Sequence, residues 1–249
     1  MTISNRAAPT NRLLAALPAS SRLPFLASCE DVELTFAQVL CETDERIRYV
    51  YFPLDSFVSL ITTLADGARL EVGIVGNEGM LGVSLVLGVN KASQHALVQG
   101  AGSALRISAA AFERHCKQSV ALRLGLARYV YVLMRQLSLT AACTHFHVVE
   151  ARLARWLLLT RDRAHSNQFH LTHGILAYML GVRRVGITQA ATALHERGLI
   201  DYRRGEIDIL DNAGLEQAAC GCYQQAIDMY EQTLGSKRSL SRSSVLQRT

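Results

Sequence analysis

The most informative hydrophobic pattern lies in residues 171–210, where two short amphipathic segments precede a basic hairpin. The apolar positions of the first segment recur at helical spacing: Ile175, Leu176, Met179 and Leu180. Thr172 is placed to cap the first turn of this helix. Gly181 then allows a left-handed stop, after which the chain can start again at an angle. The pattern predicts two helices joined by a turn of about three to four residues, the layout of a helix-turn-helix.

The second segment combines a stripe for the core with a polar face. Its apolar positions fall three and four residues apart: Ile187, Ala190, Ala191 and Leu194. The opposite face carries side chains that can contact base edges or phosphates: Arg184, Thr188, Gln189 and Thr192. Gly186 lowers the helix propensity by about 1 kcal/mol relative to alanine, and such a glycine near a helix start suggests a backbone held close to a phosphate. This segment is therefore the candidate recognition helix.

After Gly198 the alternation of apolar residues predicts two strands, with Arg203, Arg204 and Gly205 at the turn between them. Two arginines at the tip of such a wing can hold a DNA backbone. One amphipathic helix pair would be explained equally well by an ordinary small core. The full order of helix, glycine turn, polar-faced helix and basic hairpin within forty residues favours a DNA-binding winged helix-turn-helix.

Charge supports this interpretation locally but not globally. Most of the net charge of +5 comes from the last fourteen residues, which hold four basic residues and no acidic one. Residues 171–205 contain five arginines against two acidic residues, a local charge of +3 that suits the approach to phosphate. The N-terminus lacks an apolar signal-peptide core, and the longest apolar stretch, residues 80–89, is too short to cross a bilayer. We therefore expect a cytoplasmic protein whose six scattered cysteines are thiols.

The N-terminal half has a different periodicity. Residues 1–11 are polar and resemble a flexible lead, and two short helical segments around 13–17 and 23–26 resemble a lid. From Val32 the pattern changes to period two, which predicts short strands separated by turns, including an Asp66-Gly67 turn. The expected strands are residues 32–36, 47–52, 57–64, 70–75 and 94–98. A series of short strands with no long helix among them indicates a sandwich or jelly roll and excludes an α/β nucleotide-binding sheet.

The stretch LTHGILAYMLGVRRVGITQAATALHERGLIDYRRGEIDIL, residues 171–210, resembles the C-terminal DNA-binding domain of the Crp/Fnr superfamily of bacterial transcription regulators. The similarity is densest from Thr172 to Leu210 and extends more weakly over residues 13–234. It implies an α+β protein with a cyclic-nucleotide-binding-like β-roll, or jelly roll, a long dimerisation helix and a winged helix-turn-helix. The expected parts are a sensor roll, a dimerisation helix with a hinge, the winged domain and a disordered basic tail: residues 1–115, 116–147, 148–235 and 236–249.

The same resemblance places the effector site in the roll. Residues Gly79, Met80, Leu81 and Gly82 correspond to the start of the cassette that holds the cyclic phosphate and ribose in the family. Members that bind cyclic AMP have a Glu and an Arg where this sequence has Met80 and Gln94. Because burying a phosphodiester without a cationic partner is costly, we expect that cyclic AMP is not bound in the usual way. His95 could donate to an anion, although a single histidine near a strand is more often only packed or exposed.

The central helix is expected over residues 120–140, after a short helix at 109–116. Six of its positions alternate in fours and threes, as in the seam of a two-stranded coiled coil: Leu122, Leu126, Tyr129, Leu133, Gln136 and Thr140. Leu124, Val130 and Val132 lie off this seam, so a second face is also apolar. The helix could pack on its own roll and on a twin helix at once; the alternative is the central helix of a monomer.

Residues 143–147 interrupt the helical pattern and are the expected hinge. His145 and His147 could ligate a metal or haem, but two residues apart in a helix they diverge, and no third ligand is evident. The Cys220-x-Cys222 pair is a weak metal signal without a second pair, so packed thiols and no metal site are expected. Three arginines of the next helix, which should cover the helix-turn-helix, are expected to face outward: Arg152, Arg155 and Arg161.

The sequence thus predicts a homodimeric, sequence-specific DNA-binding regulator, with an unknown cofactor and effector and no catalytic residues. Arg184 and Gln189 are the candidates for base readout, and Val185, where many relatives have Glu, could contact a thymine methyl. The candidate phosphate contacts are Arg183, Thr188, Arg203 and Arg204. Partners are a pseudo-palindromic duplex, a second copy and, through the resemblance, RNA polymerase. The alternative is a regulatory module whose winged domain binds a protein.

Overall fold

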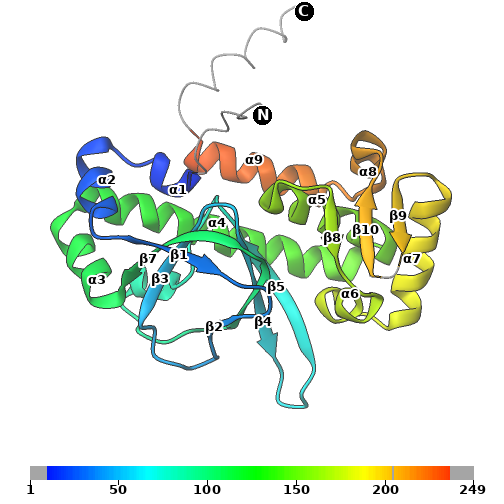
Figure 1. The fold of residues 1–249 in the computed structure, drawn as a ribbon, viewed down its shortest axis with the longest axis horizontal. Coiled ribbons are helices and arrows are strands. Elements are labelled where there is room, and N and C mark those ends of the chain that lie inside the picture. The colour runs from blue at the N-terminus through cyan, green and yellow to red at the C-terminus, as the bar shows by residue number, and fades with distance from the viewer. Residues whose placement is uncertain (1–9, 204, 236–249) are drawn as a thin grey trace, which may run out of the picture.

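The computed structural model describes residues 10–203 and 205–235. It starts with two short helices, α1 (Arg12–Ala15) and α2 (Ala19–Leu26), which cover one end of the N-terminal domain (Figure 1). Asn11, which we expected in a flexible lead, is buried. Its side-chain amide donates to the carbonyls of Pro53 and Gly79, and its Oδ1 accepts from the Leu14 amide. The lead is therefore anchored from this residue on, while residues 1–9 and the tail 236–249 lie outside the described part.

The N-terminal domain is a roll of two antiparallel sheets, as predicted. One sheet has the order β1-β7-β3 and the other β2-β6-β4-β5. The strands are β1 (Glu30–Leu34), β2 (Val39–Cys41), β3 (Tyr49–Pro53), β4 (Phe57–Thr63), β5 (Arg69–Val75), β6 (His95–Gly100) and β7 (Gly102–Ser108). Five of the seven follow the period-two segments of the sequence. The short β2, the central β7 and the 3-10 helix η1 (Val83–Leu87) were not predicted.

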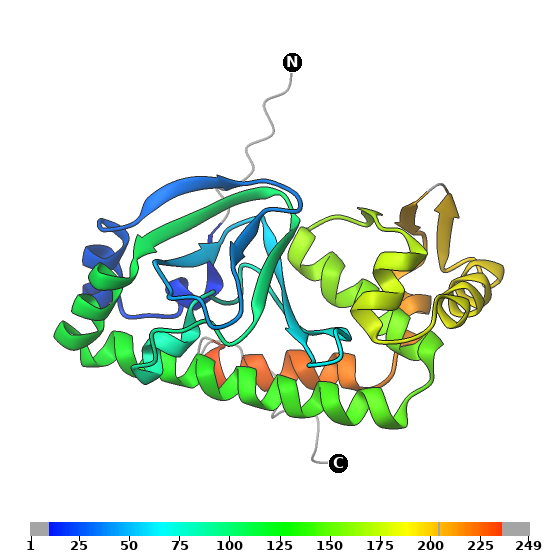
Figure 2. The ribbon, with the colours of Figure 1, turned by 90° about the horizontal axis from the view of Figure 1, so that it is seen from below.

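Two helices follow the roll, α3 (Ala109–Gln118) and the long α4 (Val120–Phe146). Figure 2 shows α4 running along both halves of the molecule. The helix does not stop near Thr140 as predicted; it continues through Cys143 to Phe146, with His147 as its C-cap. The expected hinge is therefore mostly helical, and the break in the chain lies only at residues 147–148.

The prediction of which face of α4 forms the dimer seam was wrong, because that face packs on the roll of the same chain. Leu122, Leu126 and Tyr129, which we expected in the dimer seam, are buried with residues of the roll and the lid. A different stripe, also spaced in fours and threes, is exposed along the helix: Val120, Leu124, Ala127, Tyr131 and Met134. Both faces are apolar, so the 3.5-residue repeat occurs twice on this helix and the sequence could not tell which copy packs internally.

The C-terminal part forms a helical core with a small three-stranded sheet of order β8-β10-β9. Its elements are α5 (Val149–Ala164), β8 (Gln168–His170), α6 (His173–Leu180), α7 (Arg184–Glu196), β9 (Ile200–Arg203), β10 (Glu206–Ile209), α8 (Asn212–Ala218) and α9 (Cys222–Leu234). The last helix leaves this core and packs along α4 (Figure 2). Its Tyr230 and Leu234 are buried with residues of the roll, so α9 joins the two halves.

The two halves are also joined directly by buried polar contacts. On α5, Trp156 donates from Nε1 to Glu71 of β5 at 2.7 Å, and Arg163 forms an ion pair with Glu78 at 2.9 Å. Arg152, expected to face outward, is buried, and its guanidinium donates to the Leu180 carbonyl at 2.5 Å. That carbonyl lies at the end of α6, where helical acceptors lack intrahelical partners. None of the helices in the described residues is both long and apolar enough to span a membrane.

Candidate nucleic-acid interface

The helix-turn-helix consists of α6, a turn at Gly181 and α7. Thr172 caps α6 by accepting from the Ile175 amide at 3.2 Å, as the sequence predicted. Gly181 closes the helix in the left-handed region at φ 62°. A Cβ at Gly181 would also lie 2.7 Å from Leu70 Cδ1 of the roll, so the tip of that side chain would have to move to admit it. The turn thereby holds α7 at a fixed angle to α6.

One face of α7 is buried and the other is exposed. The predicted apolar stripe lies in the core, led by Ile187 and Leu194, both fully buried. The predicted DNA-binding residues lie on the opposite, exposed side: Arg183, Arg184, Val185, Thr188 and Gln189. Within the described residues Arg183 and Arg184 form no ion pair, and 60% of Val185 is exposed. Two cations and an apolar side chain are thus presented together at the N-terminal end of a helix, where the helix dipole also favours anions.

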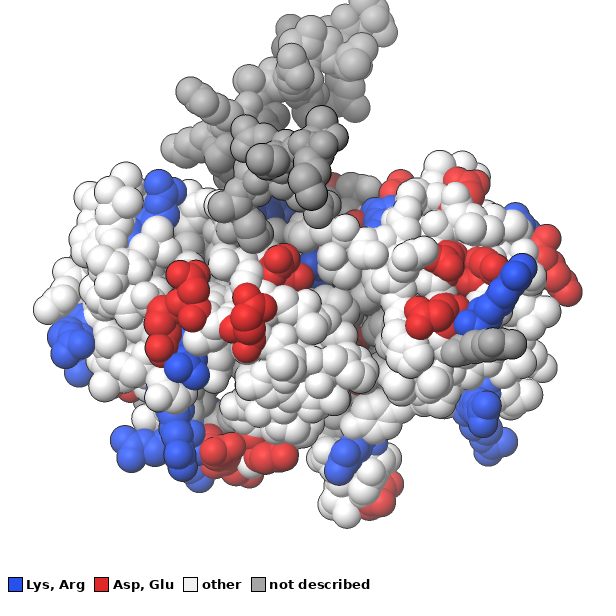
Figure 3. Space-filling model, viewed as in Figure 1, with Lys and Arg blue, Asp and Glu red and all other residues white. Residues whose placement is uncertain are grey.

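The hairpin β9–β10 forms a wing beside α7, but its charge is more balanced than expected. Arg203 is highly exposed, yet its Nε lies 3.0 Å from an Asp201 carboxylate oxygen. Figure 3 shows acidic and basic side chains side by side around this hairpin, and further basic side chains protruding near the α6–α7 turn. Arg204, the second predicted phosphate contact of the wing, lies outside the described residues. The described free cations are therefore on α7 rather than on the wing.

A contact that the sequence did not predict ties the wing to the two helices. His173, the first residue of α6, stacks on the Tyr202 ring of β9 at a centroid distance of 4.2 Å. Its Nδ1 lies 3.1 Å from the Thr188 hydroxyl, which also donates to the Arg184 carbonyl. Burial and the charge of Arg184 lower the pKa of His173, so a neutral ring is favoured. Thr188 is consequently engaged within the protein, because its one hydroxyl hydrogen is donated to the Arg184 carbonyl.

The predicted effector residues occupy a tightly packed loop of the roll. Gly79 lies against the Tyr129 hydroxyl so closely that a Cβ could not be accommodated. Met80 is buried in the core beneath the loop, and Leu81 exchanges backbone hydrogen bonds with Tyr51. Gly82 is in the left-handed region at φ 93°. Burial and the neighbouring Glu78 raise the pKa of Tyr129, so its hydroxyl stays protonated.

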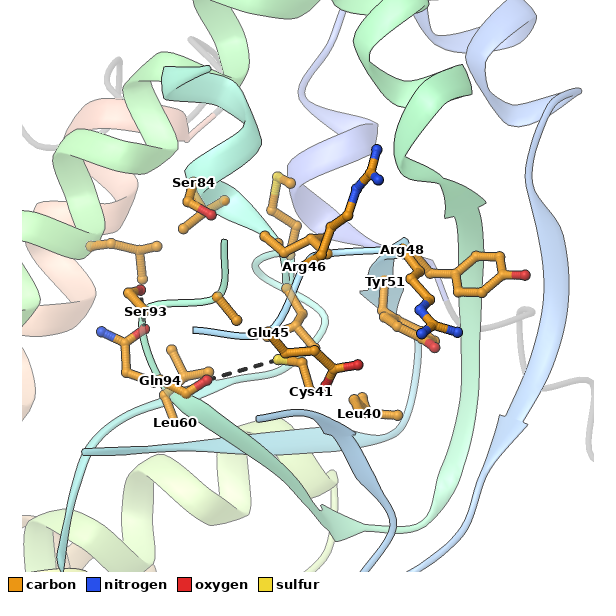
Figure 4. A pocket seen from close by; sticks show the side chains of 18 residues that line it. Leu40, Cys41, Glu45, Arg46, Arg48, Tyr51, Leu60, Ser84, Ser93 and Gln94 are labelled. Carbon is orange, nitrogen blue, oxygen red and sulfur yellow. Dashed lines mark hydrogen bonds between the residues drawn. The ribbon is translucent and has the colours of Figure 1, made fainter. Parts of the chain in front are cut away.

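A pocket lies beside this loop, and Figure 4 shows the side chains that surround it. Met80, Leu81 and Gly82 line the pocket together with Gln94, so the structure brings these predicted residues together. The Cys41 thiol donates a long hydrogen bond, at 3.8 Å, to the backbone carbonyl of Gln94. His95 does not line the pocket; its Nδ1 pairs with Glu42 at 2.7 Å. Arg46 and Arg48, which we did not single out, are the cationic side chains around the pocket.

The structure also corrects the expectation that His147 has no further ligands nearby. Cys143, Cys220 and Cys222 lie beside it, and the four potential ligand atoms are all within 4.8 Å of one another. His145 is not part of the cluster, and its ring packs edge-on against Phe146. The fold brings together two segments whose contacting residues are 75 and 77 positions apart, which the spacing within each segment could not reveal.

The geometry defines a class of protein: a β-roll joined by a long helix to an exposed winged helix-turn-helix. Residues 151–218 match the family described as the Crp-like helix-turn-helix domain. Residues 151–218 therefore form a Crp-like helix-turn-helix domain, and the fold of the chain is similar to that of solved regulators of the CRP and Crp/Fnr families.

Solved structures have the same fold over most of the chain. FixK2 from Bradyrhizobium japonicum has a TM-score of 0.66 at 16% identity, covering 78% of this chain and 98% of that one. A CRP-family transcriptional regulator from Thermus thermophilus has a TM-score of 0.64 at 19% identity, covering 76% and 96%. The c-di-GMP-responsive global regulator CLP from Xanthomonas campestris has a TM-score of 0.63 at 15% identity, covering 78% and 100%. No curated protein sequence matches the chain.

Proposed function

We propose that the protein is a homodimeric transcription regulator that reads a pseudo-palindromic DNA site with α7. The observation that carries the proposal is the exposed N-terminal face of α7, where Arg183 and Arg184 have no acidic partner among the described residues. An arginine with no internal partner is available for guanine or phosphate. Two such helices in a dimer would enter successive major grooves about 34–36 Å apart.

The roles of the individual side chains follow from their positions. Arg184 and Gln189 lie on the exposed face of α7 and are assigned to base edges, with Val185 against a thymine methyl. Arg183 is the N-cap residue of α7 and is assigned to phosphate, as are the wing residues Arg203 and Arg204. Thr188 is assigned to phosphate as well, which requires its hydroxyl hydrogen to turn from the Arg184 carbonyl to the phosphate oxygen. Because Arg203 also pairs with Asp201, we assign it a smaller share of the affinity than Arg183.

Dimerisation is assigned to α4 through its exposed stripe, not through the face that packs on the roll. Val120, Leu124 and Met134 are each more than half exposed and lie on one side of the helix with Ala127 and Tyr131. A twin helix would cover this stripe in a coiled coil. Sedimentation should show that Leu124→Asp dissociates the dimer, whereas Leu137→Asp, an exposed position away from the stripe, should leave it associated.

The effector is assigned to the pocket beside the Gly79–Gly82 loop and is not cyclic AMP bound in the usual way. Met80 is buried and Gln94 is neutral, so neither replaces the carboxylate and guanidinium that the nucleotide would require. Arg46 and Arg48 line the pocket together with Glu45, so the charges that an effector would meet here differ from those of a cyclic-AMP site. The same proposal includes contact between the DNA-bound regulator and RNA polymerase, which a transcription assay tests.

Selection of bound sequences from a random duplex pool tests the proposal. The purified protein should enrich a pseudo-palindrome, and the logarithm of its affinity should fall with the logarithm of salt concentration by about 0.9 per neutralised phosphate. The test should be repeated with candidate nucleotides present. An unenriched pool under all these conditions, with binding indifferent to salt, would favour the competing function, a winged module that binds a protein.

A further inference from the structure

Four metal-ligating side chains meet where α4 ends and α9 begins. Cys143 lies in the last turns of α4, and His147 is the C-cap of that helix. Cys220 and Cys222 flank Gly221, the N-cap of α9. The Sγ atoms of Cys143 and Cys220 are 3.5 Å apart, and Cys222 Sγ lies 3.6 Å from His147 Nδ1.

These separations match the edges of a small coordination tetrahedron. Zinc binds thiolate sulfur at about 2.3 Å and imidazole nitrogen at about 2.0 Å, so a tetrahedral ion sets its ligands about 3.8 Å apart for S–S and about 3.5 Å for S–N. All four ligand atoms lie within 4.8 Å of one another, so small rotations of the side chains would complete the site. An iron–sulfur cluster places several atoms between its cysteines and would need far wider spacing.

We propose that Cys143, His147, Cys220 and Cys222 form a Cys₃His site that binds one Zn²⁺ ion per chain. Three thiolates with one imidazole are a soft ligand set that favours zinc among the divalent ions with tetrahedral preference, and four protein ligands close the site as in structural zinc centres. Binding replaces the thiol protons, which pass to solvent, by bonds to the metal.

The surroundings suit the charge of such a centre. Zn²⁺ with three thiolates and a neutral imidazole carries one negative charge. The guanidinium of Arg155 lies at the same end of α4, where its Nη2 donates to the Thr140 hydroxyl at 3.3 Å. The Nε of Arg155 is buried and has no hydrogen-bond partner within the described residues. The three cysteines are buried and His147 is exposed, which leaves a route for the ion from solvent.

The position of the centre gives it a mechanical consequence. It joins the end of α4, immediately before the break at residues 147–148, to the start of α9, which packs back along α4. From α9, the Tyr230 hydroxyl donates at 2.9 Å to the carbonyl of Glu78, the residue before the Gly79–Gly82 loop. A bound ion would therefore fix the hinge and hold α9 against both halves. This role is independent of which DNA sequence α7 reads.

Metal content of the purified full chain tests the site. Protein produced with zinc and dialysed against a moderate chelator in reducing buffer should retain one zinc per chain. His147→Ala should lose it, while His145→Ala, an exposed histidine two residues away, should keep it. Cys143→Ala should also lose the ion, with Cys116→Ala, a cysteine outside the cluster, as its control. Equal zinc in His147→Ala and the unaltered chain would overturn the proposal, as would no uptake by the folded, reduced chain.

Cobalt provides a readout of geometry that a destabilised variant cannot mimic. Co²⁺ added to the reduced apoprotein should give the intense ligand-field bands of a tetrahedral thiolate site, and zinc should displace them. Weak octahedral bands would contradict the site, as would a Cys143–Cys220 disulfide that persists in reducing buffer. The metal is measured without DNA, so this result and the result of the duplex selection fail or succeed separately.

Discussion

Arginines occupy two contrasting surfaces of the C-terminal domain. On α7, Arg183 and Arg184 are exposed and have no acidic partner among the described residues. On α5, Arg152 and Arg163 are buried, one on a helix-end carbonyl and the other on Glu78 of the roll. Buried charges must be paired within the protein, whereas exposed unpaired ones remain free for a ligand. The same residue type therefore holds the domain in place on one face and is left available for a ligand on the other.

The buried pair allows the strongest test of this contrast. Arg163→Met should lower the free energy of unfolding by about 3–5 kcal/mol, because it leaves the Glu78 carboxylate buried without a cation. Urea denaturation followed by Trp156 fluorescence reports on the same interface. Arg197→Met is the matched control: its 2.7 Å pair with Glu150 is partly exposed and should contribute about 0–1 kcal/mol. Equal losses in the two variants would mean that the α5 interface is not held by its buried pair.

A second test uses the carboxyl group beside the only tryptophan of the chain. Burial raises the pKa of Glu71 from 4.5 to about 7, against the opposing hydrogen bonds from Ser59 and Trp156. The folded protein thus favours the protonated form of Glu71. The contribution of this protonated carboxyl to stability is fully present below pH 4.5 and is lost as the pH rises through about 7.

Fluorescence of Trp156, whose Nε1 donates to Glu71, should therefore titrate near neutral pH. Glu71→Gln keeps a neutral acceptor at the same place and should give a flat profile. If the fluorescence transition persisted in Glu71→Gln, another group would be titrating, and the interface would not depend on the protonation of Glu71.

The two surfaces differed in how far the sequence revealed them. The α7 face could be predicted because it is local: its stripe, its polar residues and the glycine turn fall within one continuous segment. The α5 interface could not, because Arg152 and Arg163 find their partners 28 and 85 residues away. The same reason hid the cysteine cluster, whose members come from the ends of two helices. On α4 the difficulty was different, since two apolar stripes share one periodicity and only packing decides between them.

The exposed face predicts a sequence-dependent effect at Arg184. Arg184→Ala should lose about 1–3 kcal/mol of discrimination at one base pair of the selected site, measured by mobility shift on matched and mismatched duplexes. Arg183→Ala, at the adjacent residue that we propose contacts phosphate, should instead weaken binding to all duplexes to a similar degree and lower the salt slope by about 1. If Arg184→Ala weakened binding to all duplexes equally, Arg184 would contact the DNA backbone and not a base.

The smallest expected effect comes from Gly186→Ala, a variant that should change the stability of the fold and the affinity for DNA separately. Gly186 lies in the first turn of α7, and a Cβ added there would meet nothing within 4 Å. Gly186→Ala should therefore stabilise the folded protein, by about 1 kcal/mol or less, through its higher helix propensity. If a phosphate approaches this backbone, the same methyl group should weaken binding to every duplex, so that stability and affinity change in opposite directions.

Gly174→Ala supplies the matched control for Gly186→Ala. It lies in the first turn of α6, where a Cβ would meet only the Thr172 hydroxyl at 3.7 Å, and it is outside the exposed face of α7. This variant should gain similar stability without loss of affinity. If Gly186→Ala bound DNA as tightly as the unaltered protein, the backbone of α7 would not approach phosphate there, and recognition would depend on the side chains further along the helix.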